Sequence, residues 1–233
     1  MGLDTVEIVM EIEEAFSITI PDDEASRLVT VGDVFDYIVA KTNVPKQPAV
    51  CLSAIAFYSI RRAAMTLGAT KRLRPRDSTL TVLPDSKRRR YWAELQEKSE
   101  LRLPPLRRPR WLVAICTLAV IACSVYFGVL AYRINYSQLA GLAAATAIGS
   151  IVGVIASWLT RPFAAYPANN CITFRGLAES ALVLNFKTLS ERYNGANTSD
   201  IWIALRSIIV EQLGVSPEEV EPAASFVNDL GCD

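Results

Sequence analysis

The chain contains no histidine, and this absence excludes several kinds of site. Catalytic triads, metal-ligand sets and acid–base pairs that depend on imidazole cannot be built from its 233 residues. Cysteine is also scarce: the five residues form no C-x-x-C pair, so a zinc site is not expected. Their odd number argues against a disulfide scaffold and favours a reducing, cytoplasm-facing context. Cys51 and Cys232 have no activating neighbour in the sequence and are expected to be buried or incidental thiols.

Net charge is also absent, but the zero total hides strong segregation along the chain. Residues 1–41 hold ten acidic and two basic side chains, and residues 197–233 hold seven acidic and one basic. Residues 61–110 hold fifteen basic and five acidic side chains. Such segregation is typical of separate structural units, and the basic one should be attracted to acidic protein surfaces or anionic lipid.

Two long stretches have no charged residue, from Trp111 to Tyr132 and from Gln138 to Thr160. At a rise of about 1.5 Å per residue, each is long enough to cross a hydrocarbon layer of about 30 Å. The link of residues 133–137 is too short for a domain, so the two predicted helices form a hairpin. Neither stretch contains an ionisable residue, which favours an anchor over a transporter.

Flanking charge predicts the orientation of this hairpin. Five arginines lie outside it and one lies in the link, which places both termini in the cytoplasm. These are Arg102, Arg107, Arg108, Arg110 and Arg161 against Arg133. The second span also carries small residues at every fourth position: Gly141, Ala145, Gly149, Gly153 and Ser157. This face either pairs with a second copy of the chain or packs against the first span.

Both ends of the chain predict short amphipathic helices. Apolar residues between Val6 and Phe16 share one side of a helix whose other side is rich in carboxylates. A second helix is expected to begin after Thr30, an N-cap residue type, and a third to run from about residue 199 to Gly214. Each end alone contains too little apolar surface to form a stable core.

The two ends resemble portions of an acyl carrier protein, in reversed order. The C-terminal sequence DLGCD matches the first five positions of the family's D-L-G-x-D-S-L motif. The N-terminal sequences LDTVE, IPDDEA and TVGDVFDYI match the segments that come after that motif in the family. The resemblance covers about a third of the chain, and it implies an all-α, four-helix carrier fold assembled from both ends.

The resemblance also implies a cofactor site that this sequence alters. In the family, a serine at the start of the second helix receives 4′-phosphopantetheine, and Gly2 stands at that position. Glycine has no hydroxyl, so no cofactor is expected at the matched position. Gly2 reflects either a real loss of carrier chemistry or a start assigned within a longer product. The acidic helix implies a partner-facing surface, formed by Glu7, Glu11, Glu13 and Glu14.

The middle of the chain looks like a diverged second copy of the same fold. Leu67-Gly68, Arg74-Pro75 and Thr79-Leu80 echo Leu213-Gly214, Glu221-Pro222 and Ser225-Phe226. Beyond the hairpin, the segment 172–177 echoes residues 29–34. The two spans are therefore expected to be inserted between the second and the last helix of this degenerate domain.

Basic residues occupy the second helix of this degenerate domain: Lys87, Arg88, Arg89 and Arg90. They favour either an acidic carrier domain as partner or anionic phospholipid, and the absence of an RNA-binding signature argues against nucleic acid. Ser86 is the one serine with a positional claim to phosphopantetheine, but an Asp-Ser pair is also an ordinary N-cap.

The sequence as a whole predicts an all-α protein of the bacterial inner membrane with cytoplasmic termini. The expected segments are 1–41 (second half of a carrier-like domain), 42–50 (linker), 51–106 (first part of the degenerate domain), 107–161 (transmembrane hairpin), 162–196 (remainder and linker) and 197–233 (first half of the carrier-like domain). We expect a non-enzymatic binding or scaffold role in fatty-acid or lipid metabolism, with enzymes of acyl metabolism as partners. A carrier bearing phosphopantetheine and a structural, lipid-adsorbing protein are the alternatives. The ends either close within one chain or exchange in a homodimer.

Overall fold

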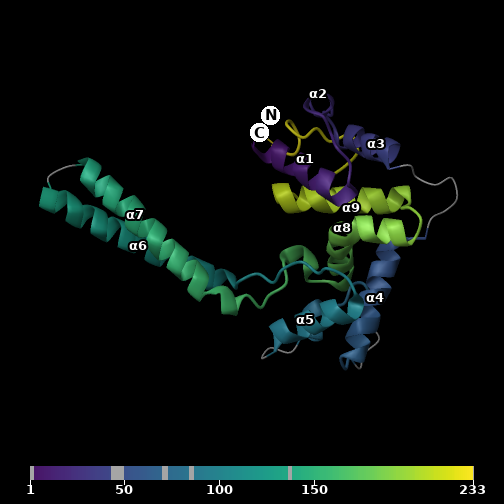
Figure 1. Cartoon of the computed structure of the whole chain (residues 1–233), viewed down its shortest axis with the longest axis horizontal. Helices are drawn as coiled ribbons and strands as arrows, with labels where there is room; N and C mark the ends of the chain where they lie inside the picture. The colour runs from purple at the N-terminus through teal and green to yellow at the C-terminus, as the bar shows by residue number, and fades with distance from the viewer. Residues whose placement is uncertain (1–2, 43–49, 70–72, 84–86, 136–137, 233) are drawn as a thin grey trace. The chain divides into compact units, whose positions relative to one another are not determined.

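The computed structural model describes residues 3–42, 50–69, 73–83, 87–135 and 138–232. The described residues form helices and irregular segments without a named strand, so the all-α prediction is confirmed. The chain divides into two compact units, one of residues 1–104 and 169–233 and one of residues 105–168 (Figure 1).

The first unit contains helices from both ends and from the middle of the sequence. Its α-helices are α1 (Leu3–Phe16), α2 (Asp22–Ala25), α3 (Val31–Lys41), α4 (Leu52–Thr66), α5 (Arg88–Ser99), α8 (Phe174–Arg192) and α9 (Thr198–Leu213). Helix α8 packs against α1, α4 and α9, so it connects the terminal helices to the central ones.

Local chemistry accounts for the helix boundaries in this unit. Thr30 caps α3 as predicted, because its hydroxyl accepts from Asp33 N while the Asp33 carboxylate accepts from Thr30 N at 2.8 Å. Gly214 ends α9 as predicted, with a left-handed φ of 67° that glycine adopts without strain. Helix α1 ends at Phe16, and Ser17 then takes a left-handed φ of 54°.

Backbone hydrogen bonds join the two ends of the chain. Val31 N donates to Ala224 O at 3.0 Å, Gly32 N to Pro222 O at 2.8 Å, and Phe226 N to the carbonyl at position 29 at 3.2 Å. We call this contact of residues 29–32 with 222–226 the terminal clasp. A Cβ at Gly32 would lie 2.8 Å from the Pro222 carbonyl oxygen, so the close approach requires glycine.

The middle of the chain contains a second contact of the same kind. Phe174 N donates to Asp77 O at 3.0 Å, Arg175 N to Pro75 O at 2.8 Å, and Thr79 N to the carbonyl at position 172 at 2.7 Å. We call this contact of residues 75–79 with 172–175 the central clasp. In both clasps the first two residues of a helix, α3 or α8, donate to the segment that follows another helix, α9 or α4.

Two buried polar side chains connect parts of this unit that are distant in sequence. Asp200 of α9 is fully buried and accepts from the N–H groups of Leu52 and Ser53, at 2.8 and 3.0 Å, so it caps helix α4. Asn185 of α8 exchanges two 2.9 Å hydrogen bonds with the backbone of Arg102. Both side chains satisfy backbone groups that their own helices cannot reach.

The second unit contains the helices α6 (Arg110–Asn135) and α7 (Gln138–Leu159). Both are long and apolar enough to cross a membrane, and their large apolar side chains are exposed. The two helices approach closely at small residues. A Cβ added to Gly128 would lie 3.0 Å from Ala145 Cβ, and a Cβ added to Gly149 would lie 2.4 Å from Ser124 Oγ. The small-residue face of α7 therefore packs against α6 at Gly149, whereas nothing lies within 4 Å at Gly153.

Candidate functional site

The candidate site lies where the C-terminal segment meets the start of helix α1. Leu230 and Cys232 are buried, and Gly231 between them takes a left-handed φ of 67°. The Cys232 sulfur lies 3.3 Å from the Thr5 hydroxyl, although the two residues are 227 positions apart. The start of α1 and the last described residues therefore lie side by side (Figure 1).

Three features of this site bear on the sequence predictions. Gly2, the residue at the family's serine position, lies outside the described residues. The first hydroxyl of the described part of α1 belongs to Thr5, which is half-buried against Cys232. Cys232 is buried as expected for an inert thiol, whereas Cys51 is exposed and donates to Asp200.

The acidic surface of α1 is less open than the sequence suggests. Glu11 accepts a hydrogen bond from the Gln212 side chain of α9, and Glu13 accepts from the backbone N–H at position 20 at 2.6 Å. Glu7 and Glu14 are exposed, and within the described part of the chain their carboxylates have no partner. Of the four acidic residues singled out from the sequence, Glu7 and Glu14 are thus the two whose carboxylates are exposed and unpaired in the described part of the chain.

The apolar core beneath α1 is nearly filled. A small cavity of about 30 Å³ lies between α1, α3 and Phe226, lined among others by Ile8, Ile12 and Val34. A single water molecule needs about 10–15 Å³ of such space, so the cavity is small. An acyl chain does not fit there without repacking of these side chains.

The predicted basic surface lies at the start of helix α5. Lys87 is the N-cap, Arg88 is half-buried, Arg89 is exposed, and Arg90 pairs with Glu94 at 2.8 Å. Cations at a helix N-terminus add to the positive end of the helix dipole, so the electrostatic potential of this surface is positive. Ser86, the other candidate for the cofactor, lies outside the described residues.

The pKa shifts in this unit arise from local contacts. The backbone N–H and hydroxyl of Thr30 hold the pKa of the Asp33 carboxyl below its usual value. Burial raises the pKa of Tyr91, on the helix that carries the basic residues.

Among the residues that the structure describes, no group of three or more acidic or cysteine side chains could hold a metal ion.

Sequence reasoning missed Asp200 and Asn185, which connect the terminal and central helices. Asp200 looked like an ordinary polar residue in the first turn of a predicted helix, and Asn185 interrupts an apolar helix. An isolated polar residue at an otherwise apolar helix position was the one signal that could have singled out Asn185.

Comparison with known proteins finds similarity over part of the chain. A stretch of 37 residues, 16% of this chain, is 61% identical to the acyl carrier protein of Wolinella succinogenes and covers 49% of that protein. A stretch of 38 residues, also 16% of this chain, is 54% identical to the acyl carrier protein of Rubrobacter xylanophilus and covers 47% of it. The chain thus spans about half the length of the curated relatives it matches. No protein-family model and no solved structure matches. The chain contains an acyl-carrier-like region.

Proposed function

We propose that this protein is a membrane-anchored, acyl-carrier-like binding or scaffold protein of fatty-acid or lipid metabolism. The observation that carries the proposal is the terminal clasp, which joins the two segments that resemble the acyl carrier family. In this proposal α9 supplies the first carrier helix and α1 to α3 supply the rest, so the carrier is circularly permuted around the middle of the chain.

The residues present do not fit 4′-phosphopantetheine at the matched position. Gly2 has no hydroxyl, and the Thr5 hydroxyl is half-buried beside Cys232 at 3.3 Å. The proposed role is therefore non-enzymatic: Glu7 and Glu14 present the acidic carrier surface to partner enzymes, without a thioester of their own.

The membrane anchor in this proposal is the α6–α7 hairpin. The exposed apolar side chains of both helices support it, because the core helix of a soluble protein buries such residues. Arg107 and Arg108 precede α6 and Arg161 follows α7, in agreement with cytoplasmic termini at a bacterial inner membrane.

A second, degenerate carrier fold is proposed for the middle of the chain. The central clasp repeats the hydrogen bonds of the terminal clasp, and Thr173 caps α8 as Thr30 caps α3. The basic residues at the start of α5 then stand where carriers are acidic, and they offer a surface for an acidic carrier or anionic lipid.

The proposal is tested first by the intact mass of the full chain, extracted from membranes after co-expression with a phosphopantetheinyl transferase of broad specificity. We expect no added pantetheine arm. A gain of one arm, mapped by peptide fragmentation to Ser86 or to any other serine, contradicts the scaffold role and makes the protein a carrier.

A positive test measures binding of a carrier-recognising enzyme of fatty-acid synthesis to the full chain in nanodiscs. Reversing both exposed charges, Glu7→Lys with Glu14→Lys, should slow association at low salt. Reversing two exposed acidic residues of the loop after α9, Glu218→Lys with Glu219→Lys, is the matched control. Equal effects of the two pairs, or binding to anionic liposomes alone, would favour the lipid-adsorbing alternative.

A further inference from the structure

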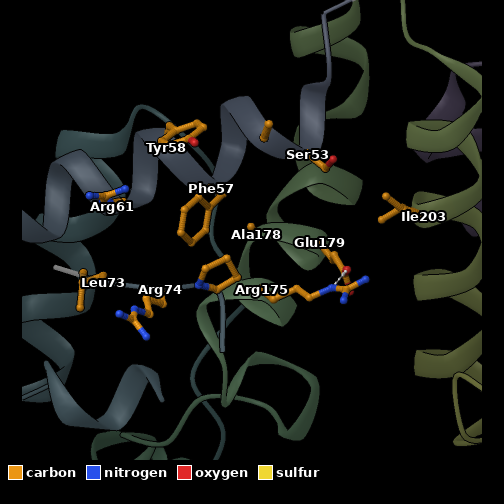
Figure 2. Close-up of a pocket in the computed structure, with 12 residues that line it drawn as sticks. Ser53, Phe57, Tyr58, Arg61, Leu73, Arg74, Arg175, Ala178, Glu179 and Ile203 are labelled. Atoms are coloured by element: carbon orange, nitrogen blue, oxygen red, sulfur yellow. Dashed lines mark hydrogen bonds and ion pairs between the residues drawn. The ribbon is translucent and has the colours of Figure 1, made fainter. Parts of the chain in front are cut away.

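A large, open cavity lined by apolar and charged side chains of described residues lies outside both carrier-like surfaces. It measures about 620 Å³ and lies between α4, the 73–75 segment, α8 and α9. Figure 2 shows the Phe57 ring on α4, with Ala178 of α8 nearby and Ile203 of α9 at one side, and Pro75 also lines the cavity. Its volume falls within the range of about 300–1,000 Å³ that is typical of small-molecule sites.

Three arginines from three different segments also line this cavity: Arg61 of α4, Arg74, and Arg175 of α8. Arg175 pairs with Glu179 at 2.8 Å, so this pair is neutral as a whole. The guanidinium groups of Arg61 and Arg74 have no hydrogen-bond or ion-pair partner within the described ranges. Two positive charges therefore remain at the rim, and Figure 2 shows both beside Leu73, on the opposite side of Phe57 from the Arg175–Glu179 pair.

This arrangement places two unpaired cations beside apolar side chains within one site. Arg61 and Arg74 lie toward one end, Phe57 lies between them and the neutral Arg175–Glu179 pair, and Pro75 and Ile203 also line the cavity. An arginine fork recognises planar or tetrahedral anions through two parallel N–H donors. A simple anion would leave the apolar lining exposed to water, whereas an uncharged chain would leave both guanidinium groups without a partner.

We propose that this cavity binds a single-chain anionic amphiphile, with its carboxylate or phosphate head between Arg61 and Arg74 and its alkyl chain along Phe57 and Pro75. The site lies between the helices of the central clasp and helix α9, and it does not use the acidic surface of α1. The inference therefore stands whether or not the terminal helices act as a carrier scaffold.

The proposal is tested by calorimetric titration of the full chain, in nanodiscs of zwitterionic phosphatidylcholine, with octyl phosphate. Empty nanodiscs provide the blank for partitioning of the probe into lipid. We expect saturable binding to one site. Because hydrogen bonds to charged groups are strong, the double variant Arg61→Gln with Arg74→Gln should bind about tenfold more weakly or worse.

The chain offers a matched control for this variant. Arg62 and Arg76 are exposed neighbours of the two arginines and do not line the cavity. The double variant Arg62→Gln with Arg76→Gln carries the same change in net charge and should bind octyl phosphate with unchanged affinity. An equal loss of affinity in both variants would show a general charge effect and overturn the proposal.

Two further ligands test the two halves of the amphiphile. Inorganic phosphate and octanol should each bind much more weakly than octyl phosphate. If phosphate alone binds as tightly, the site recognises an anion only; if octanol does, it is an apolar cavity only, and either result overturns the proposal. Repeating the titration in nanodiscs that contain phosphatidylglycerol, a lipid with two acyl chains, tests the single-chain assignment. Unchanged binding of octyl phosphate supports a soluble single-chain anion, whereas competition by the bilayer lipid overturns it.

Discussion

A disulfide between the two ends of the chain would test how the terminal clasp closes. The hydroxyl of Thr5 and the thiol of Cys232 lie 3.3 Å apart, so Thr5→Cys places two sulfur atoms close enough to bond after a small rotation. Upon oxidation we expect a cross-linked monomer that migrates faster than the reduced protein on a non-reducing gel. Glu7→Cys, two positions along α1 and exposed, is the control and should not cross-link to Cys232.

The expected gain in stability depends on the length of the closed loop. The two residues are 227 positions apart, for which the chain-entropy account gives about 5 kcal/mol as an upper limit. Engineered disulfides commonly contribute about 2–4 kcal/mol. At about 2–4 °C per kcal/mol, the oxidised variant should melt roughly 5–15 °C above its reduced form in a circular-dichroism scan.

Two outcomes would contradict closure within one chain. A covalent dimer as the main product would show that neighbouring chains exchange their ends. Free thiols in both residues after oxidation would show that the terminal segments do not meet at all. Because the comparison uses one variant in two redox states, a general effect of the substitution cannot imitate either result.

Three further predictions concern polar contacts in the same unit. Gly32→Ala should lower the melting temperature, because its Cβ would lie 2.8 Å from the Pro222 carbonyl oxygen, and an unchanged melting curve would mean that the terminal clasp adds nothing to stability. Asp200→Ala should lower the free energy of unfolding by about 2–4 kcal/mol, because it leaves two N–H groups of α4 without an acceptor. A urea titration measures this loss, and a loss below about 0.5 kcal/mol would refute the capping role. Asp33→Ala should cost about 1 kcal/mol at neutral pH. Because Thr30 lowers the pKa of the Asp33 carboxyl in the folded protein, this stabilisation is present above the unfolded pKa of 3.8 and is lost as the pH falls through the lower folded value. The melting temperatures of the wild-type protein and the Asp33→Ala variant should therefore converge in acid. A constant difference between them would argue against the contact.

Local sequence signals predicted the helices well because their causes are local. Thr30 and Gly214 mark helix ends through contacts within a few residues, and the structure places a cap at each. The two long helices were predicted equally well, because an uncharged stretch of more than twenty residues can be recognised without knowledge of the segments that it contacts.

Contacts between distant segments could not be predicted in the same way. The sequence echo paired Thr79 with Ser225, whereas the clasps align Thr79 with Phe226, one position later. The echo of Pro75 with Pro222 agrees with the clasps, so the one-residue shift changes the hydrogen-bond assignment at Thr79 while leaving the sequence similarity almost unchanged. The Asp200 cap on α4 depends on a separation of 148 residues, and nothing in either local sequence signals it.

Segments of opposite net charge, which the sequence suggested were separate structural units, fold together in the first unit. The acidic termini and much of the basic middle belong to one compact unit. Of four described ion pairs in this unit, one lies within the acidic N-terminal segment, one within the basic middle and one within α8, and the fourth joins α8 to the end of α5. These pairs are Lys41–Glu24, Arg90–Glu94, Arg175–Glu179 and Arg192–Glu100. Exposed pairs of this kind contribute little to stability, so charge complementarity does not explain why the ends and the middle associate. Buried contacts through α8, the clasps and Asp200 account for that association, and the exposed charges of α1 and α5 remain available to other molecules.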